Sequence, residues 1–190
     1  MFLKIWNVKA ILQHWLLVAI VVTGLIGLLY AAVQQDLRQG ANDPQIQMAE
    51  DTAAKLADGQ SVQSVVPLEK VDLAKSLAPY LIVFGANGNP IASSAQLDGQ
   101  TPTIPSGVFD SVRQMGEDRI TWQPQAGVRS AIVVTQFKGS TSGFVLAGRS
   151  LREVEKREDD LLQILVVGWL VMILVTFVAT AILFRKNSAS

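Results

Sequence analysis

The sequence of 190 residues carries 16 Lys and Arg against 16 Asp and Glu, contains no cysteine, and has a single histidine. The zero net charge gives no support for nucleic-acid binding, and the lack of cysteine excludes disulfide bonds and thiolate metal sites. We expect no metal and no cofactor.

The first long element is an apolar block that runs from Ala10 to Gln35 without a charged residue. About 20 apolar residues of helix cross the hydrocarbon core of a bilayer, so the block predicts a transmembrane helix over 10–33, after a short cytoplasmic segment over 1–9. A cleaved signal peptide is the alternative. Signal h-regions run only about 7–15 residues, whereas the apolar stretch Trp15–Val33 has 19. We therefore expect an uncleaved anchor.

Small side chains recur every four residues in this block, at Thr23, Gly27 and Ala31. This spacing places them on one helix face, where small residues let two membrane helices approach closely. The pattern indicates a homodimer or a complex with a membrane partner protein.

Two helices are expected next. Asp43-Pro44 is typical of an N-cap followed by proline in the first turn, and the helical spacing continues to Ala57 before Asp58-Gly59 ends it. A loop over 60–67 and a short helix over 72–77 are expected before Pro79.

The pattern then changes to strands, with an Asn-Gly turn at 87–88 that is typical of a hairpin. A helix with apolar residues on one face is expected over 105–115. Five strands are expected, over 80–84, 91–95, 119–123, 128–137 and 143–148. Their short connections predict antiparallel pairing, and hence an α+β domain with a five-stranded antiparallel sheet and packed helices.

The last element begins with Ser150 and Glu153, which have the spacing of a capping box. The charged helix over 151–160 contains no proline or glycine, and it continues into a second uncharged block, Leu161–Phe184. We predict that this exit helix, marked by Ser150, Glu153, Glu158 and Asp160, transmits motion from the domain to a second transmembrane helix over 161–184.

Charge sets the expected orientation. Lys4 and Lys9 precede the first block, Arg185 and Lys186 follow the second, and the segment between carries 12 − 16 = −4. Lys and Arg flanks stay in the cytoplasm. We expect a two-pass protein of a bacterial cytoplasmic membrane, with the domain over 34–160 outside and a cytoplasmic tail over 185–190.

The segments 80–94 and 144–155 resemble the first hairpin, and the closing strand with its exit helix, of PAS-like (Cache-type) extracytoplasmic domains of bacterial sensor histidine kinases. The resemblance implies a sensor of a ligand or of stress. Only six residues follow Phe184, which leaves no room for a HAMP linker or a kinase, and His14 lies in the first membrane block. We expect no enzyme activity, and an output that passes through a partner such as a kinase.

In PAS-like domains the ligand lies between the sheet and the helix and loop after the first hairpin. The resemblance makes Tyr80, Trp122, Arg129 and Arg149 candidates for a small-molecule site, since arginine binds carboxylates with two parallel hydrogen bonds and aromatic rings can wall a pocket. Core packing of the aromatics and surface positions for the arginines are the alternatives.

Three functions stay open from the sequence. The first is a signal-input module of a two-component-like system. The second is an accessory or scaffold subunit of a membrane complex, because a fold does not fix a function. The third is a truncated sensor-kinase remnant.

Overall fold

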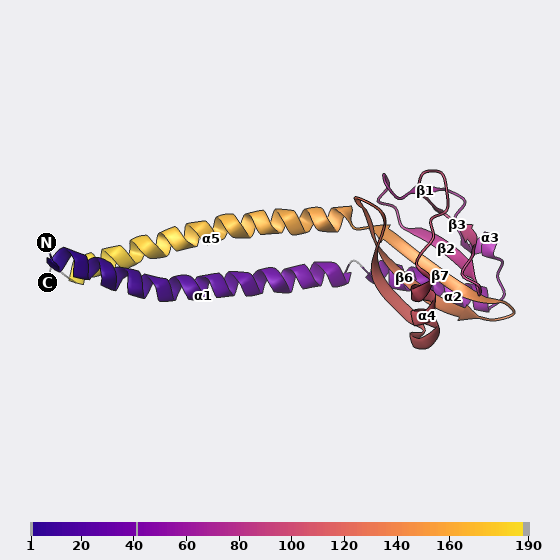
Figure 1. Ribbon diagram of the computed structural model, residues 1–190, viewed down its shortest axis with the longest axis horizontal. Coiled ribbons are helices and arrows are strands. Elements are labelled where there is room, and N and C mark those ends of the chain that lie inside the picture. The colour runs from indigo at the N-terminus through magenta and orange to yellow at the C-terminus, as the bar shows by residue number, and fades with distance from the viewer. Residues whose placement is uncertain (1, 41, 188–190) are drawn as a thin grey trace. The chain divides into compact units, whose positions relative to one another are not determined.

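The structure is a computed structural model that describes residues 2–40 and 42–187, with side chains over 8–40 and 42–185. The chain forms two compact units (Figure 1). One consists of Met1–Asp36 with Arg157–Ser190, and the other of Leu37–Lys156.

The first unit is built from two long helices, α1 (Phe2–Gly40) and α5 (Arg152–Asn187), which lie side by side and antiparallel in it (Figure 1). Both helices are long and apolar enough to cross a membrane by length and composition, and nearly all of each apolar stretch is exposed. A soluble domain places such stretches in its core. Leu28, for example, is 70% exposed.

The second unit is an α+β domain around a five-stranded antiparallel sheet, as the sequence predicted. The strand order is β3-β2-β7-β6-β5. The strands are β2 (Tyr80–Gly85), β3 (Pro90–Ser93), β5 (Glu117–Gln125), β6 (Val128–Lys138) and β7 (Ser142–Ser150). Two further short strands that were not predicted, β1 (Val71–Asp72) and β4 (Ala95–Gln96), pair in parallel.

One face of the sheet is covered by α4 (Ser106–Met115), with Val108, Phe109 and Val112 buried. The Phe109 ring lies 5.1 Å from that of Phe84 and 4.9 Å from that of Phe144, which joins the helix to two strands. We call this side the α4 face.

The other face is covered by α2 (Asp43–Ala57) and the single turn α3 (Val62–Val65). Ala49, Ala53 and Leu56 of α2 share a core with Val133, Val145 and Ala147 of β6 and β7. We call this side the α2 face. Because strand side chains alternate between the two faces, each strand contributes to both cores.

Several local expectations are wrong. No helix forms over 72–77. Asp72 ends β1 instead, and its Oδ1 accepts a hydrogen bond of 3.0 Å from the Ala74 N–H. The expected loop over 60–67 contains α3, and the N-cap of α2 is Asn42 rather than Asp43. The expected capping box is also absent, because Ser150 is the last residue of β7 and its Oγ accepts from the N–H of Arg152, at 3.3 Å, rather than from that of Glu153.

Candidate functional site

The two aromatic candidates lie in the core of the α4 face. Tyr80 is 1% exposed and Trp122 is 6% exposed. Gly148 is paired with Tyr80 across β2 and β7, and the ring of Tyr80 lies so close over Gly148 that a Cβ there would be 2.4 Å from Cζ. Gly148 therefore makes room for the tyrosine.

The hydroxyl of Tyr80 is an unusual core group. The hydroxyls of Tyr80 and of Ser130, the cross-strand neighbour of Trp122, are both buried, and neither has a hydrogen-bond partner within 2–40 and 42–187. Burial raises the pKa of the Tyr80 phenol.

The two arginine candidates lie on the opposite side of the sheet. Arg129 lies four residues before the buried Val133 of β6, and Arg149 lies two residues after the buried Ala147 of β7. Side chains an even number of residues apart on a strand share one face of the sheet, so both arginines belong to the α2 face. Both are exposed. The structure therefore does not bring the four candidates together. The even spacing of Arg129 from Val133 and of Arg149 from Ala147, both on the α2 face, was the signal in the sequence that separates the arginines from the two aromatics.

Arg129 instead contacts the start of α5, and Arg149 of β7 contacts the segment before β2. The Nε of Arg149 donates to the carbonyl of Leu77 at 3.2 Å, and Arg129 forms an ion pair with Glu155 of α5. Arg152, which sequence reasoning missed, donates to the carbonyl of Lys75 at 2.7 Å. The Leu151 N–H donates to the carbonyl of Arg129 at 2.9 Å.

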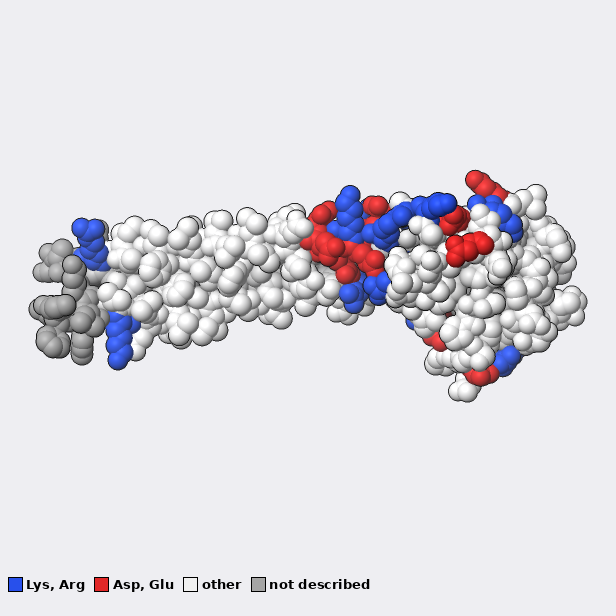
Figure 2. All heavy atoms as spheres, turned by 45° about the horizontal axis from the view of Figure 1, so that its top comes forward, with Lys and Arg blue, Asp and Glu red and all other residues white. Residues whose placement is uncertain are grey.

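We call the contacts made by Arg129, Arg149, Arg152 and Glu155 the α5 root. They attach the first turns of α5 to β6, and both β7 and α5 to the segment 75–77, which leads into β2. Of the other exit-helix residues, Glu153 and Glu158 are half-buried and Asp160 is exposed. Charged side chains of both signs gather around this start of α5 in Figure 2.

Tryptophans join the helix pair of the first unit. The Nε1 of Trp169 in α5 donates to Oγ1 of Thr23 at 2.9 Å, and the Nε1 of Trp15 in α1 donates to the carbonyl of Ile173 at 3.2 Å. The Thr23 hydroxyl donates its own proton to the carbonyl of Ala19 at 2.7 Å. An indole N–H in an apolar helix needs an acceptor, which was the available sequence signal for Trp169.

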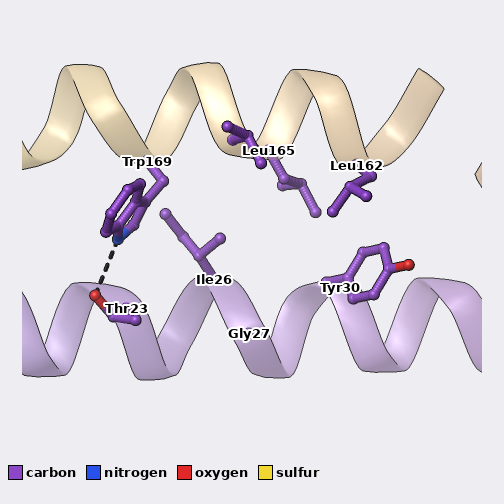
Figure 3. Close-up of a pocket in the computed structure, with 8 residues that line it drawn as sticks. Thr23, Ile26, Gly27, Tyr30, Leu162, Leu165 and Trp169 are labelled. Atoms are coloured by element: carbon purple, nitrogen blue, oxygen red, sulfur yellow. Dashed lines mark hydrogen bonds between the residues drawn. The ribbon is translucent and has the colours of Figure 1, made fainter. Parts of the chain in front are cut away.

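Beside Trp169 the two helices leave an apolar groove of about 220 Å³ (Figure 3). Its lining residues are Thr23, Ile26, Gly27, Tyr30, Leu162, Leu165, Val166 and Trp169. Thr23 and Gly27 thus face α5, whereas Ala31 does not line the groove. A Cβ added at Gly27 would meet no atom within 4 Å, so α5 does not pack closely against this glycine.

A second groove lies in the sheet domain, between α2 and α3, with the buried Leu81 of β2 among its lining residues. Its volume is about 380 Å³, and α2 contributes Met48, Asp51 and Lys55 to its wall. Within the described residues there is no group of three His, Asp or Glu side chains that could hold a metal ion.

No protein-family model matches the chain, and no curated protein matches it.

Proposed function

We propose that the chain is the signal-input module of a membrane signalling system. In this proposal α1 and α5 cross a bacterial cytoplasmic membrane, the sheet domain lies outside, and both termini lie inside. Three features support it: the exposed apolar surface of both helices, the Lys and Arg at their cytoplasmic ends, and the resemblance to PAS-like sensor domains.

The continuity of α5 is the observation that carries the proposal. The helix runs from Arg152 to Asn187 as one element, so residues of the sheet domain and the second apolar stretch belong to the same helix. A continuous helix transmits displacement and rotation, because every backbone hydrogen bond ties one turn to the next.

The α5 root connects this helix to the sheet domain, which senses the cue in this proposal. Arg149 and Arg152 bind carbonyls of 75–77, only a few residues before the buried Tyr80 of β2. A cue that moves this segment would pull on the first turn of α5. Charge-assisted hydrogen bonds of this kind are about twice as strong as neutral ones.

An accessory or scaffold role is the second candidate. It is favoured by the burial of Tyr80 and Trp122, which act as core residues and line neither of the two grooves. Thermal unfolding of the full chain in detergent, measured against a broad library of metabolites, separates the two roles. A metabolite that raises the melting temperature in wild type but not in a groove variant such as Asp51→Asn supports sensing, and no stabilisation across the library supports the scaffold.

The proposed topology has a direct test because the chain contains no cysteine. Single-cysteine variants Ser140→Cys, in the exposed β6–β7 turn, and Asn7→Cys, before the first apolar block, are treated in intact cells with a thiol reagent that cannot cross membranes. We expect the Ser140→Cys variant to be labelled in intact cells, and the Asn7→Cys variant to be labelled only after the cells are opened. Equal labelling of the two variants in intact cells would contradict the topology.

A further inference from the structure

We propose that the groove between α2 and α3 binds a small ω-amino acid, a zwitterion whose two charges stand at opposite ends of a short apolar chain. The inference deepens the proposed function by giving the sheet domain a ligand class, and it rests on that function for the role of the ligand. The groove lies on the α2 face of the sheet, whereas the aromatic candidates Tyr80 and Trp122 belong to the core of the α4 face.

Apolar side chains form the inner wall of this groove. Leu81 of β2 is only 5% exposed, and Met48 of α2 and Val65 of α3, which also line the groove, are half-buried. The volume of about 380 Å³ lies within the range of about 300–1,000 Å³ that is typical of small-molecule sites, which combine apolar walls with a few polar groups. This wall suits the methylene groups of a small ligand.

A hydroxyl without a partner lies in the same wall. Thr52 lines the groove and is 5% exposed, and its side chain makes no hydrogen bond to any residue that the structure describes. Its oxygen is not one of the unpartnered atoms that are sealed from solvent, so it opens into the groove. By contrast, Thr23, Thr176 and Thr180 each donate to the carbonyl one helical turn earlier. The Thr52 hydroxyl is therefore available to donate to a ligand carboxylate.

Two opposite charges stand at the rim of the groove. Asp51 and Lys55 are exposed and lie one turn apart on α2, about 6 Å along the helix axis. An acidic residue four positions before a lysine can form an ion pair with it on a helix. Within 8–40 and 42–185, however, the side chain of neither residue makes a salt bridge or a hydrogen bond. The aspartate is thus available for an ammonium group, and the lysine for a carboxylate.

The spacing of these groups favours an ω-amino acid. In its extended form δ-aminovalerate holds its ammonium and its carboxylate about 6 Å apart, with only methylene groups between them. The ammonium then meets Asp51, and the carboxylate meets Lys55 and Thr52. The methylene groups lie between these contacts, against Leu81. Exposed ion pairs contribute little to binding, so we expect a dissociation constant in the millimolar range.

The test follows the methionine methyl groups by nuclear magnetic resonance, with the full chain in detergent micelles and δ-aminovalerate as the probe. Met48 lines the groove, whereas Met115 belongs to α4 and Met172 to α5. We expect the Met48 resonance to shift to saturation at millimolar ligand, while the other two stay in place. Norvaline, an isomer with both charges at one end, and valerate, which has no ammonium, should bind several-fold more weakly.

Asp51→Asn and Lys55→Gln each remove one rim charge, and Glu50→Gln is their matched control. Glu50 is also an exposed residue of α2, but it does not line the groove. We expect the dissociation constant to rise several-fold in Asp51→Asn and in Lys55→Gln, and to stay at the wild-type value in Glu50→Gln. The swap Asp51→Lys with Lys55→Asp should keep the binding, because the zwitterion can lie in the groove in either direction.

The inference is overturned by an unmoved Met48 resonance, by equal binding of norvaline or valerate, or by an equal loss of affinity in Glu50→Gln. A Met48 shift that depends on protein concentration without ligand would show that a second copy occupies the groove, which also overturns it. These measurements report binding alone, so such outcomes leave the proposed transmission through α5 standing. Transmission is measured separately, by the activity of a kinase fused to α5, and its failure would leave the binding site standing.

Discussion

Tyr80 and Gly148 form a pair in which the smallest residue makes room for one of the largest. In Gly148→Ala the new Cβ would lie 2.4 Å from Cζ and 2.5 Å from the hydroxyl oxygen of Tyr80. Because Tyr80 is buried, we expect the free energy of unfolding to fall by about 1–3 kcal/mol, the usual cost of overpacking a core. Urea unfolding of the full chain, followed by tryptophan fluorescence, measures the change.

Gly107→Ala is the control for this substitution. Gly107 lies in the first turns of α4 with no atom within 4 Å of an added Cβ, so alanine should be neutral or stabilise by up to about 1 kcal/mol through its higher helix propensity. If both variants unfold alike, the close packing of Tyr80 over Gly148 is wrong.

The buried hydroxyl of Tyr80 should make stability depend on alkaline pH. An unfolded tyrosine ionises near its ordinary value of 10.0, and burial raises the pKa in the folded protein. The folded state then holds more protons than the unfolded state above pH 10.0, so its stability falls as the pH rises. Below that pH the group contributes no pH dependence.

Tyr80→Phe tests this argument. The substitution removes a hydroxyl without a partner, so stability at neutral pH should be unchanged or higher. Above pH 10.0 the variant should lose less stability than wild type when the two are compared by urea unfolding. Parallel losses in both proteins would mean that Tyr80 ionises normally in the folded state.

At the scale of elements, periodicity predicted the parts that local sequence determines. The five strands, α4 and the continuous exit helix follow from alternation, turn residues and the lack of Pro or Gly between Ser150 and Leu161. The helix expected over 72–77 failed because Val71 and Asp72 pair with Ala95 and Gln96, more than 20 residues away. A distant partner of that kind leaves no local signal.

The candidate site was less predictable than the fold. Burial of Tyr80 and Trp122 could be expected from their strands, and strand alternation could have placed Arg129 and Arg149 on the other face. The partners of the arginines are backbone carbonyls and a residue of α5, and only the tertiary fold determines them. The same holds for the register that joins Trp169 to Thr23.

The Trp169–Thr23 hydrogen bond should stabilise the helix pair modestly. Each of Trp169→Phe and Thr23→Val removes the bond, and a cycle of the two variants cancels the other effects of each substitution. A double-mutant cycle should give a coupling of about 0.6 kcal/mol and no more than ~2, the range for hydrogen bonds between membrane helices. Unfolding in mixed micelles of increasing dodecyl sulfate content measures it. Zero coupling would contradict the pairing of these two side chains.

The Arg129–Glu155 ion pair should matter for order at the start of α5 more than for global stability. Both side chains are well exposed, at 46% and 39%, so the pair contributes at most about 1 kcal/mol. In Glu155→Gln we expect faster amide hydrogen exchange over the first turns of α5 at an almost unchanged unfolding midpoint. The swap of the two residues, Arg129→Glu with Glu155→Arg, should restore slow exchange, and failure to do so would argue against the pair.

At the scale of the whole molecule, α5 is the element that both units share. The sheet domain binds its first turns through the α5 root, and its apolar length pairs with α1 through Trp15 and Trp169. The central claim is that this one helix carries a signal from the domain through the membrane.

Helix phase tests this claim most directly. The cytoplasmic part of a sensor histidine kinase is fused after Lys186, and alanines are inserted between Asp160 and Leu161. Two inserted residues turn the part of α5 after Asp160 by about 200° relative to the part before it. Seven turn it by about 700°, which is close to two full turns. The measurement is autophosphorylation of the fused kinase in membrane vesicles. We predict that the two-residue insertion changes the activity and that the seven-residue insertion keeps the activity of the unaltered fusion. Equal activity in all three proteins would contradict transmission through α5.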